Sequence, residues 1–293
     1  MAVQVISTIS EMQSISEKLR LNGKSIGVVP TMGYLHEGHA RLIKAAVLEN
    51  DIVIVTIFVN PLQFAANEDL SSYPRNFKRD IEVVNDMGGT IVFAPSVEEM
   101  YPEGFDTTIK TGNISLKFEG VFRPTHFDGV ATVVMKLFMA TKPHSAYFGQ
   151  KDYQQVTVLR QLIRDLRIDV FIRVLDTVRE TDGLAKSSRN VYLSTVEREK
   201  ATILSKALTL AIKAALQGER RRDTLNEIMK NELKSFEDIH IDYASAACAE
   251  TLEEPPLFAP EGEIVFLVAV RLGKTRLIDN MVYRPGTSPE FLL

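Results

Sequence analysis

Two histidines stand three residues apart in the stretch VPTMGYLHEGHARLI, as His36 and His39 with Glu37 and Gly38 between them. Imidazole nitrogens can bind a metal, transfer a proton or donate hydrogen bonds to an anion. Zinc proteases place two histidines four residues apart on one helix, whereas here the spacing is three and a glycine interrupts. The spacing favours an anion site, while zinc and a structural pair stay open as alternatives.

The position of the pair along the chain supports the anion site. The apolar run 25–30 predicts a buried strand, and the residues after the pair are apolar at helical spacing. His36 and His39 would then begin a helix, where unpaired backbone N–H groups and the helix dipole favour phosphate. Imidazole donors there can stabilise charge on a triphosphate. Gly33 and Gly38 would let the backbone approach the ligand closely.

A second group of phosphate-binding side chains occurs in TDGLAKSSRNVYLS, residues 181–194. It combines two cations with two hydroxyls on a polar turn, namely Lys186, Ser187, Ser188 and Arg189. Alone, this stretch would read as a solvated surface loop. Beside the histidine pair, it indicates a mobile loop that closes on phosphates.

Alternating helix and strand patterns predict the scaffold for these residues. After the first strand, further strands are expected at 51–60, 90–95, 145–149 and 169–175. Helices are expected between them, at 39–49, 76–87, 129–140 and 153–165. Because this alternation is typical of parallel sheets covered by helices, we predict an α/β, Rossmann-like doubly wound sheet.

The pattern changes after about Val178, and we predict a smaller α+β C-terminal domain there. Long helical patterns are followed by three strand patterns, at 195–217, 222–235, 239–248, 263–272 and 275–283. Gly273 and Lys274 lie between the last two strands and predict a hairpin turn. The expected domains are 1–178 and 179–293.

Composition narrows the class of protein. The 293 residues carry a net charge of −4, and Arg220–Arg222 reads as a helix cap, so no nucleic-acid partner is expected. No apolar run approaches the ~20 residues that cross a bilayer, and the first residues lack a secretory pattern. The single cysteine, Cys248, fits a reducing compartment and reads as a core residue. A cytoplasmic protein without a membrane partner is expected.

Five motifs narrow the interpretation further. PTMGYLHEGH, FVNPLQF, RPTHFDGVATVV, FGQKDYQQ and DGLAKSSRNVYLS follow one another between Pro30 and Ser194. The first and last resemble the paired signatures of the H-x-G-H nucleotidyltransferase superfamily. Together, the five resemble the pantoate–beta-alanine ligase family. One position departs from that family's pattern, since Gln150 stands where a glutamate is expected, and we predict that this residue contributes mainly its backbone.

The resemblance implies an ATP-dependent ligase with a Rossmann-like ATP- and pantoate-binding domain and a closing C-terminal domain that carries the Lys186–Arg189 motif. Pantoate and β-alanine would give pantothenate, AMP and pyrophosphate through an enzyme-bound pantoyl adenylate. The substrate carboxylate itself attacks phosphorus, so the protein would position groups and stabilise charge. Members of the family are typically homodimers.

The resemblance also implies the residues of the site. Those implied to act in catalysis are His36, His39, Lys151, Ser187, Ser188 and Arg189. Those implied to bind ATP are Met32, Gly33, Tyr34, Leu35, His36, Glu37, Gly38, His39, Gly149, Gln150, Lys151, Asp152, Val178, Lys186, Ser187, Ser188 and Arg189. Val178 would act through its backbone.

Pantoate and a metal ion would have further neighbours. Gln63 and Gln155 suit pantoate because a carboxamide offers donors and an acceptor without charge, and Asn60 would assist them. Mg²⁺ is expected with ATP, with Asp80 and Asp152 as neighbours. Arg123 is expected to serve a salt bridge or a dimer contact.

Two other functions remain open at this point. A related adenylyl- or cytidylyltransferase would share the H-x-G-H chemistry and leave the nucleotide on its product, but it has no obvious use for Gln63 and Gln155. A non-catalytic nucleotide-binding protein would keep the fold without turnover.

Overall fold

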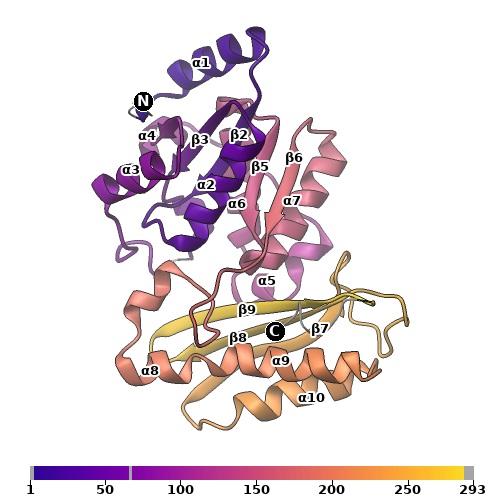
Figure 1. The fold of residues 1–293 in the computed structure, drawn as a ribbon. Coiled ribbons are helices and arrows are strands. Elements are labelled where there is room, and N and C mark those ends of the chain that lie inside the picture. Colours follow the sequence, from indigo (N-terminus) through magenta and orange to yellow (C-terminus); the bar gives the residue numbers. More distant parts are fainter. Residues whose placement is uncertain (1–2, 66–67, 287–293) are drawn as a thin grey trace. The chain divides into compact units, whose positions relative to one another are not determined.

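The computed structural model describes residues 3–65 and 68–286 of the chain (Figure 1). The chain forms two compact units. The first unit comprises residues up to Gln150 and the segment Val158–Asp176, and the second comprises Lys151–Thr157 and residues from Thr177 onward. The short segment Lys151–Thr157 therefore belongs to the second unit although the first unit flanks it on both sides in the sequence.

The first unit is built on a parallel sheet that, within the described residues, has six strands. Their order across the sheet is β1 (Gln4–Ile6), β4 (Ile91–Phe93), β3 (Ile52–Ile57), β2 (Ile26–Thr31), β5 (Ser145–Gly149) and β6 (Phe171–Leu175). Each neighbouring pair runs parallel. The predicted Rossmann-like sheet is confirmed.

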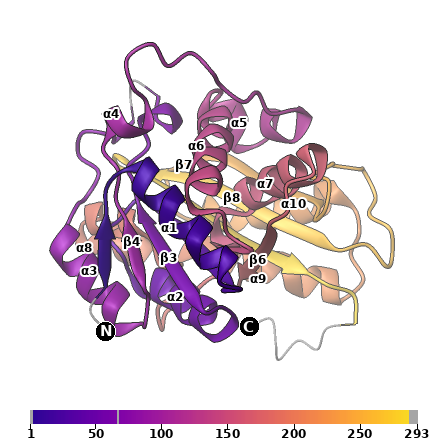
Figure 2. The same ribbon diagram turned by 90° about the horizontal axis from the view of Figure 1, so that it is seen from above.

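Helices cover both faces of this sheet, as the continuous apolar strands require. Val29, Val53 and Val55 share a core cluster with residues of α2 (Glu37–Glu49) and α3 (Phe77–Asp86). Alternate strand residues point to the other face. There α1 (Ile9–Leu21) and α6 (His126–Thr141) pack against each other and against β2 (Figure 2).

The remaining elements of the first unit are short, apart from one helix. They are η1 (Pro61–Gln63), α4 (Val97–Met100), η2 (Asn113–Leu116) and α5 (Glu119–Phe122). The 3₁₀ turn η3 (Gln150–Asp152) and helix α7 (Tyr153–Leu166) follow β5 and contain the segment that belongs to the second unit.

The strand order places the predicted site residues of the first unit beyond the carboxyl ends of neighbouring parallel strands. The chain leaves β2 toward β3 and β4, and later returns to the opposite side of β2 as β5 and β6. In such sheets ligands bind beyond the carboxyl ends of the strands where the order reverses. Met32 directly follows β2, and Gln150 directly follows β5. Asn60 comes shortly after β3.

The second unit has an antiparallel sheet of three strands within the described residues. These are β7 (Ile239–Cys248), β8 (Ile264–Leu272) and β9 (Thr275–Tyr283), and helices α9 (Ile203–Leu216) and α10 (Arg222–Leu233) pack against them. The predicted hairpin is confirmed, since Leu272 pairs with Thr275 across a turn in which Gly273 has a φ of +54°. A left-handed φ of this kind is accessible to glycine at little cost.

The expected helix 195–217 is two helices. α8 (Thr195–Lys200) ends before Ala201, and α9 begins at Ile203. Between them the Thr202 hydroxyl donates to the Glu199 carbonyl at 2.8 Å, and the Ser205 hydroxyl donates to the Thr202 carbonyl at 2.9 Å. These local side-chain bonds compete with the helical ladder, which explains an interruption that apolar spacing does not reveal.

Two further expectations concern the second unit. Arg220 donates to the carbonyl of Ala215 near the end of α9 at 2.6 Å, which confirms a helix-capping role. Cys248 is half-buried and packs against the core of this unit, so it is less enclosed than expected. None of the helices in residues 3–65 and 68–286 is long and apolar enough to span a membrane.

Candidate active site

The loop after β2 is shaped by the carboxylate of Asp80, which projects from the first turn of α3. Its two oxygens accept the backbone N–H groups of Tyr34 and Leu35 at 2.9 and 2.7 Å. The loop passes through left-handed backbone at Gly33 and Tyr34, with φ of +82° and +52°. A Cβ on Gly33 would lie 3.0 Å from the Asp80 carboxylate, so the glycine also makes room for this anchor.

Asp80 is itself buried, with 1% of its surface exposed. Both of its carboxylate oxygens accept backbone hydrogen bonds, so the loop satisfies the charge that burial would otherwise penalise. This geometry does not fit the expectation that Asp80 lies beside a metal ion. We interpret Asp80 as the anchor of the loop Met32–His36.

The two histidines cap the start of α2 with their Nδ1 atoms. His36 Nδ1 accepts the N–H of Gly38 at 3.1 Å, and His39 Nδ1 accepts the N–H of His36 at 3.2 Å. An Nδ1 that accepts a hydrogen bond carries no proton, so the ring proton lies on Nε2. The ring centroids are 4.1 Å apart. Each imidazole is therefore a hydrogen-bond donor through Nε2–H.

The position of the His36 ring explains why the H-x-G-H motif has glycine at position 38. A Cβ at this position would lie 2.9 Å from His36 Cε1 and 3.0 Å from His36 Nδ1. Any side chain here would therefore displace the imidazole that caps the helix. Because α2 begins at this point, its N-terminal dipole adds to the attraction for an anion.

The zinc alternative for the histidine pair receives no support from this geometry. Each Nδ1 accepts a backbone N–H, so its lone pair is already used and is not offered to a metal ion. In residues 3–65 and 68–286, no three His, Cys, Asp or Glu side chains form a group that could hold a metal ion. The arrangement fits hydrogen bonding to an anion.

Gln63 lies in η1, after β3, where Asn60 fixes its side chain. The Asn60 Nδ2 donates to Gln63 Oε1 and to the Gly129 carbonyl, each at 3.1 Å. The Asn60 Oδ1 accepts from Leu62 N–H at 3.2 Å and from the Tyr101 hydroxyl at 2.8 Å. Asn60 is 1% exposed, and its bond to Gln63 Oε1 orients the amide that it is expected to assist.

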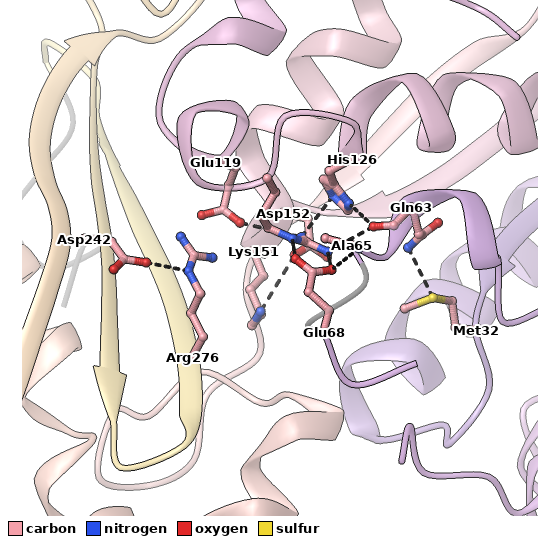
Figure 3. Close-up of polar contacts among 11 residues, drawn as sticks. Met32, Gln63, Ala65, Glu68, Glu119, His126, Lys151, Asp152, Asp242 and Arg276 are labelled. Atoms are coloured by element: carbon pink, nitrogen blue, oxygen red, sulfur yellow. Dashed lines mark hydrogen bonds and ion pairs between the residues drawn. The ribbon is translucent and has the colours of Figure 1, made fainter. Parts of the chain in front are cut away.

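The Gln63 carboxamide also reaches the loop after β2. Its Nε2 donates to Met32 Sδ at 3.2 Å, a contact that joins the residue expected to bind pantoate to the loop expected to bind ATP (Figure 3). A sulfur atom is a weak acceptor. A substrate hydroxyl or carboxylate would therefore displace Met32 at little energetic cost.

A buried network holds the backbone of Gln63 on its other side. His126 Nδ1 donates to the Gln63 carbonyl at 2.9 Å, and Arg123 Nη1 lies 3.2 Å from His126 Nε2 (Figure 3). Arg123 is bidentate to Glu68 at 2.6 and 2.9 Å, which confirms the expected salt bridge. Glu119 lies 3.7 Å from the same guanidinium. The segment after η1 is thus tied to α5 and α6.

Burial and the neighbouring Arg123 charge lower the pKa of His126 to about 4. This ring is therefore neutral near pH 7, with its proton on Nδ1 facing the Gln63 carbonyl. Burial raises the pKa of the Glu68 carboxyl, but the hydrogen bonds and charge of Arg123 outweigh it and bring the pKa below its ordinary value. A neutral imidazole and an ionised carboxylate both fit the bonds observed.

The second unit contains the other expected phosphate-binding residues. Lys151 and Asp152 follow Gly149 and Gln150 at the end of β5, and Lys151 Nζ lies 3.7 Å from Asp152 Oδ1. Gln155, the other amide expected to bind pantoate, is half-buried on the first turn of α7. The carboxylate of Asp152 is 52% exposed, unlike that of Asp80.

A small hairpin supports the lysine–serine motif of the second unit. Lys186 N–H donates to the Val178 carbonyl at 2.9 Å, and Arg179 pairs with Ala185 in an isolated antiparallel bridge. Lys186 Nζ binds Glu180 Oε2 at 3.0 Å across this hairpin. Val178 is expected to contact ATP through its backbone, and its carbonyl takes part in closing the hairpin.

The motif then continues into η4 (Ser188–Tyr192). The Ser187 Oγ accepts the N–H of Arg189 at 3.3 Å and so caps this turn. Ser188 is buried, with 7% of its surface exposed. The turn brings two hydroxyls and the Arg189 guanidinium onto one short segment, which is a donor set suited to phosphate oxygens.

The family assignment rests on nearly the whole chain. The family model for pantoate–beta-alanine ligase matches residues 4–282. The chain belongs to this family. A pantothenate synthetase of Thermotoga neapolitana is 49% identical over 280 residues, which cover 96% of this chain and 99% of the relative. One of Bacillus cereus is 47% identical over 279 residues, which cover 95% and 98%.

Solved structures give the same result. A pantothenate synthetase of Thermus thermophilus superposes with a TM-score of 0.89 at 41% identity, covering 95% of this chain and 99% of that one. A pantoate–beta-alanine ligase of Francisella tularensis, solved in complex with β,γ ATP and β-alanine, has a TM-score of 0.76 at 34% identity and covers 98% and 100%. The recognised family and fold are confirmed.

The sequence did not predict three residues that are bonded to the expected phosphate-binding segments of the second unit. Arg179 lies outside the five motifs, and Asp279 and Asn280 of β9 lie in the last hundred residues, where no motif was recognised. The stretch RLIDNMVY offered a signal, since two adjacent polar residues interrupt an apolar strand pattern. One of two neighbours in a strand normally faces the core. A buried polar group was therefore foreseeable there.

Proposed function

We propose that this member of the pantoate–beta-alanine ligase family condenses pantoate with β-alanine at the expense of ATP, giving pantothenate, AMP and pyrophosphate. The observation that carries the proposal is the start of α2. There two imidazoles accept backbone hydrogen bonds at Nδ1 and carry their protons on Nε2, where an N–H donor suits phosphate oxygens. The Gln63 carboxamide contacts Met32 of the loop before α2. The residue proposed to bind pantoate thus contacts the loop proposed to bind ATP.

The first step forms the adenylate. A pantoate carboxylate oxygen attacks the α-phosphorus of ATP, the bond from that phosphorus to the bridging oxygen breaks, and pyrophosphate leaves with the electron pair. Negative charge grows on the phosphate oxygens, and the Nε2–H groups of His36 and His39 stabilise it by hydrogen bonding. We propose that Lys151, Lys186 and Arg189 bind phosphate oxygens in the same step.

The second step transfers the pantoyl group. The β-alanine amine attacks the acyl carbon, the bond to the AMP oxygen breaks, and the amine loses a proton. Gln63 and Gln155 would hold the pantoate hydroxyls and carboxyl group through both steps, since an amide binds them without introducing charge. Ser187 and Ser188 would donate to the AMP phosphate.

We propose that Mg²⁺ accompanies ATP and is bound mainly by phosphate oxygens and water, as is usual for triphosphate sites. When bound, the ion would neutralise charge on the leaving pyrophosphate. Asp152 fits as its protein neighbour because its carboxylate is exposed, whereas the Asp80 oxygens accept backbone hydrogen bonds.

We further propose that the chain works in the cytoplasm as a homodimer. A single cysteine suits a reducing compartment. Leu116 and Val121, around η2 and α5, are 65% and 62% exposed, and such apolar side chains suit burial against a second copy. Light scattering on the purified chain would give twice the mass of one chain, and a single-chain mass would contradict the dimer.

The decisive assay measures AMP and pyrophosphate release from ATP and Mg²⁺ with pantoate alone, β-alanine alone, and both. We expect sustained AMP release only with both substrates, and His39→Ala should lower it by roughly two orders of magnitude, as loss of a transition-state donor does. AMP release that does not depend on pantoate or β-alanine would overturn the assignment of these two substrates. Nucleotide retained on the product would indicate a nucleotidyltransferase, and ATP binding without turnover would indicate a regulator.

A further inference from the structure

Two adjacent polar residues, Asp279 and Asn280, lie inside β9 of the second unit. They are 3% and 2% exposed, among strand residues that are otherwise mostly apolar. Burial of a carboxylate is strongly unfavourable unless it is paired and hydrogen-bonded. Such a pair of residues therefore needs partners, and their partners lie on two segments that are remote in sequence.

Asp279 holds the hairpin that precedes the lysine–serine motif. Its carboxylate accepts two hydrogen bonds from Arg179, at 2.7 and 3.0 Å. Arg179 also donates to the Gly183 carbonyl at 3.0 Å and to the Asn280 carbonyl at 3.2 Å. Five-donor guanidinium groups bind in a fixed planar geometry, so these bonds fix the orientation of the hairpin as well as its position.

Asn280 holds the other segment. Its Nδ2 donates to the backbone carbonyl of Lys151 at 2.8 Å, and its N–H donates to Asp279 Oδ1 at the same distance. The two phosphate-binding segments of the second unit are therefore attached to neighbouring residues of one strand. Consecutive Cα atoms are ~3.8 Å apart, which leaves little freedom between the two attachments.

We propose that Asp279 and Asn280 are positioning residues that set the distance between Lys151 and the Lys186–Arg189 motif for binding ATP phosphates. This inference rests on the proposed function of those two segments. Neither residue needs to touch ATP. Donors that must meet the oxygens of one triphosphate require a fixed spacing, and a shift of about 1 Å can cost up to a hundredfold in rate.

A purely structural role for the pair is the alternative to exclude. Replacing a buried ion pair by apolar residues often leaves stability unchanged or improves it, so stability alone does not explain these residues. The second unit offers a matched control in Asp242 of β7. Its side chain is 1% exposed and binds Arg276 at 2.6 Å (Figure 3). It also binds Arg271 at 3.2 Å. This ion pair has no contact with Lys151 or the hairpin among the bonds described for it.

The experiment compares Asp279→Asn, Arg179→Lys and Asn280→Leu with the control Asp242→Asn. Steady-state assays give kcat and the KM for ATP and for pantoate, and thermal unfolding gives Tm for each variant. We expect the three test variants to raise the KM for ATP on the order of tenfold. For Asp279→Asn and Arg179→Lys the KM for pantoate should stay within about twofold, since the hairpin that they hold contains neither Gln63 nor Gln155. Asp242→Asn should change Tm without changing the KM for ATP.

Three variants keep the proposal testable if one of them does not fold. An unchanged KM for ATP in folded test variants would overturn it, and so would an equal rise in Asp242→Asn. If the wild-type chain forms no AMP, the proposed ligase function fails. The positioning role is then tested by measuring equilibrium ATP binding. In that measurement, weaker binding in the test variants than in Asp242→Asn would support the role, and equal binding would overturn it.

Discussion

Gly38 shows how a residue without a side chain can carry part of a site. Alanine normally favours a helix over glycine by up to ~1 kcal/mol, so Gly38→Ala would be expected to stabilise α2. Its Cβ would instead lie 2.9 Å from the His36 ring. We predict that kcat/KM falls at least about tenfold while Tm changes little, because a displaced imidazole loses its alignment.

Gly112→Ala is the control for this prediction. A Cβ at Gly112 meets no atom within 4 Å, and its φ of −89° suits any residue. Steady-state kinetics and thermal unfolding of both variants test the prediction. Full activity in Gly38→Ala would show that the His36 cap is not required.

His126 predicts a pH dependence of stability. Its pKa is about 4 in the fold, against an ordinary value of 6.5. Between these values the unfolded chain binds a proton that the folded chain does not, so the free energy of unfolding falls as pH decreases from 6.5 to 4. The size of this term is about 3 kcal/mol, at ~1.4 kcal/mol for each pKa unit.

His126→Asn keeps a donor for the Gln63 carbonyl but does not titrate. Urea unfolding at pH 7 and pH 5 should therefore show a smaller loss of stability for this variant than for the wild-type chain. The same loss in both would mean that His126 does not remain neutral when buried.

At the residue scale, the motifs predicted candidate site residues but not the bonds that those residues make within the fold. His36, Lys151 and Gln63 are recognisable from short motifs because their types and spacing are local in sequence. The bonds of Asp80 and Asn60 are not local. Asp80 contacts backbone 45 and 46 residues away, and Asn60 contacts Gly129, 69 residues away. A single sequence does not show such contacts, so it did not predict that Asp80 and Asn60 support neighbouring groups.

Gly129 determines the contact between two elements. It lies in α6, and a Cβ there would be 2.3 Å from the Leu62 carbonyl oxygen and 2.7 Å from the Gln63 nitrogen. Since both atoms are backbone, η1 would have to move. We predict that Gly129→Ala lowers the free energy of unfolding by about 1–3 kcal/mol, as overpacking does, and raises the KM for pantoate.

The opposite outcome would be a gain in stability for Gly129→Ala. Glycine to alanine in an unobstructed helix stabilises it by up to ~1 kcal/mol. Urea unfolding and pantoate kinetics on Gly129→Ala decide between the two signs. A gain in stability with unchanged pantoate kinetics would show that η1 tolerates the displacement.

At the element scale, long periodic segments were predictable and short or locally interrupted ones were not. Strands β7 and β9 match their expected bounds, and α2 begins two residues before its expected start. The helix pattern from 195 to 217 missed a break that hydroxyl bonds of Thr202 and Ser205 create. No prediction was made for β1, whose three residues are too few for periodicity to be recognised.

Each of the two compact units has a hydrophobic core cluster of its own among the described residues. Phe266 is fully buried in the core of the second unit. We predict that Phe266→Ala costs about 3–5 kcal/mol and accelerates hydrogen exchange mainly in β7, β8 and β9. Leu48→Ala, at a side chain that is 79% exposed, is the control. Equal acceleration throughout β2 and β3 would show that the two cores open as one.

At the scale of the whole molecule, the sequence predicted the order of the elements. It also predicted that alternating strands and helices give way, near residue 178, to long helices followed by three strands. The sequence did not predict that Lys151–Thr157 belongs to the second unit, because this segment sits within a regular strand–helix alternation. The Asn280 bond to the Lys151 carbonyl is one contact that attaches it there. Such a contact joins residues 129 positions apart.

Because the chain alternates between the two units, the design of chimeras between relatives is constrained. The chain passes between the units after Gln150, after Thr157 and after Asp176. A fragment that starts at Thr177 therefore lacks Lys151 and the carbonyl that Asn280 binds. A chimera of two relatives that keeps each unit intact needs three junctions, and a single crossover near residue 177 would pair Asn280 of one parent with Lys151 of the other.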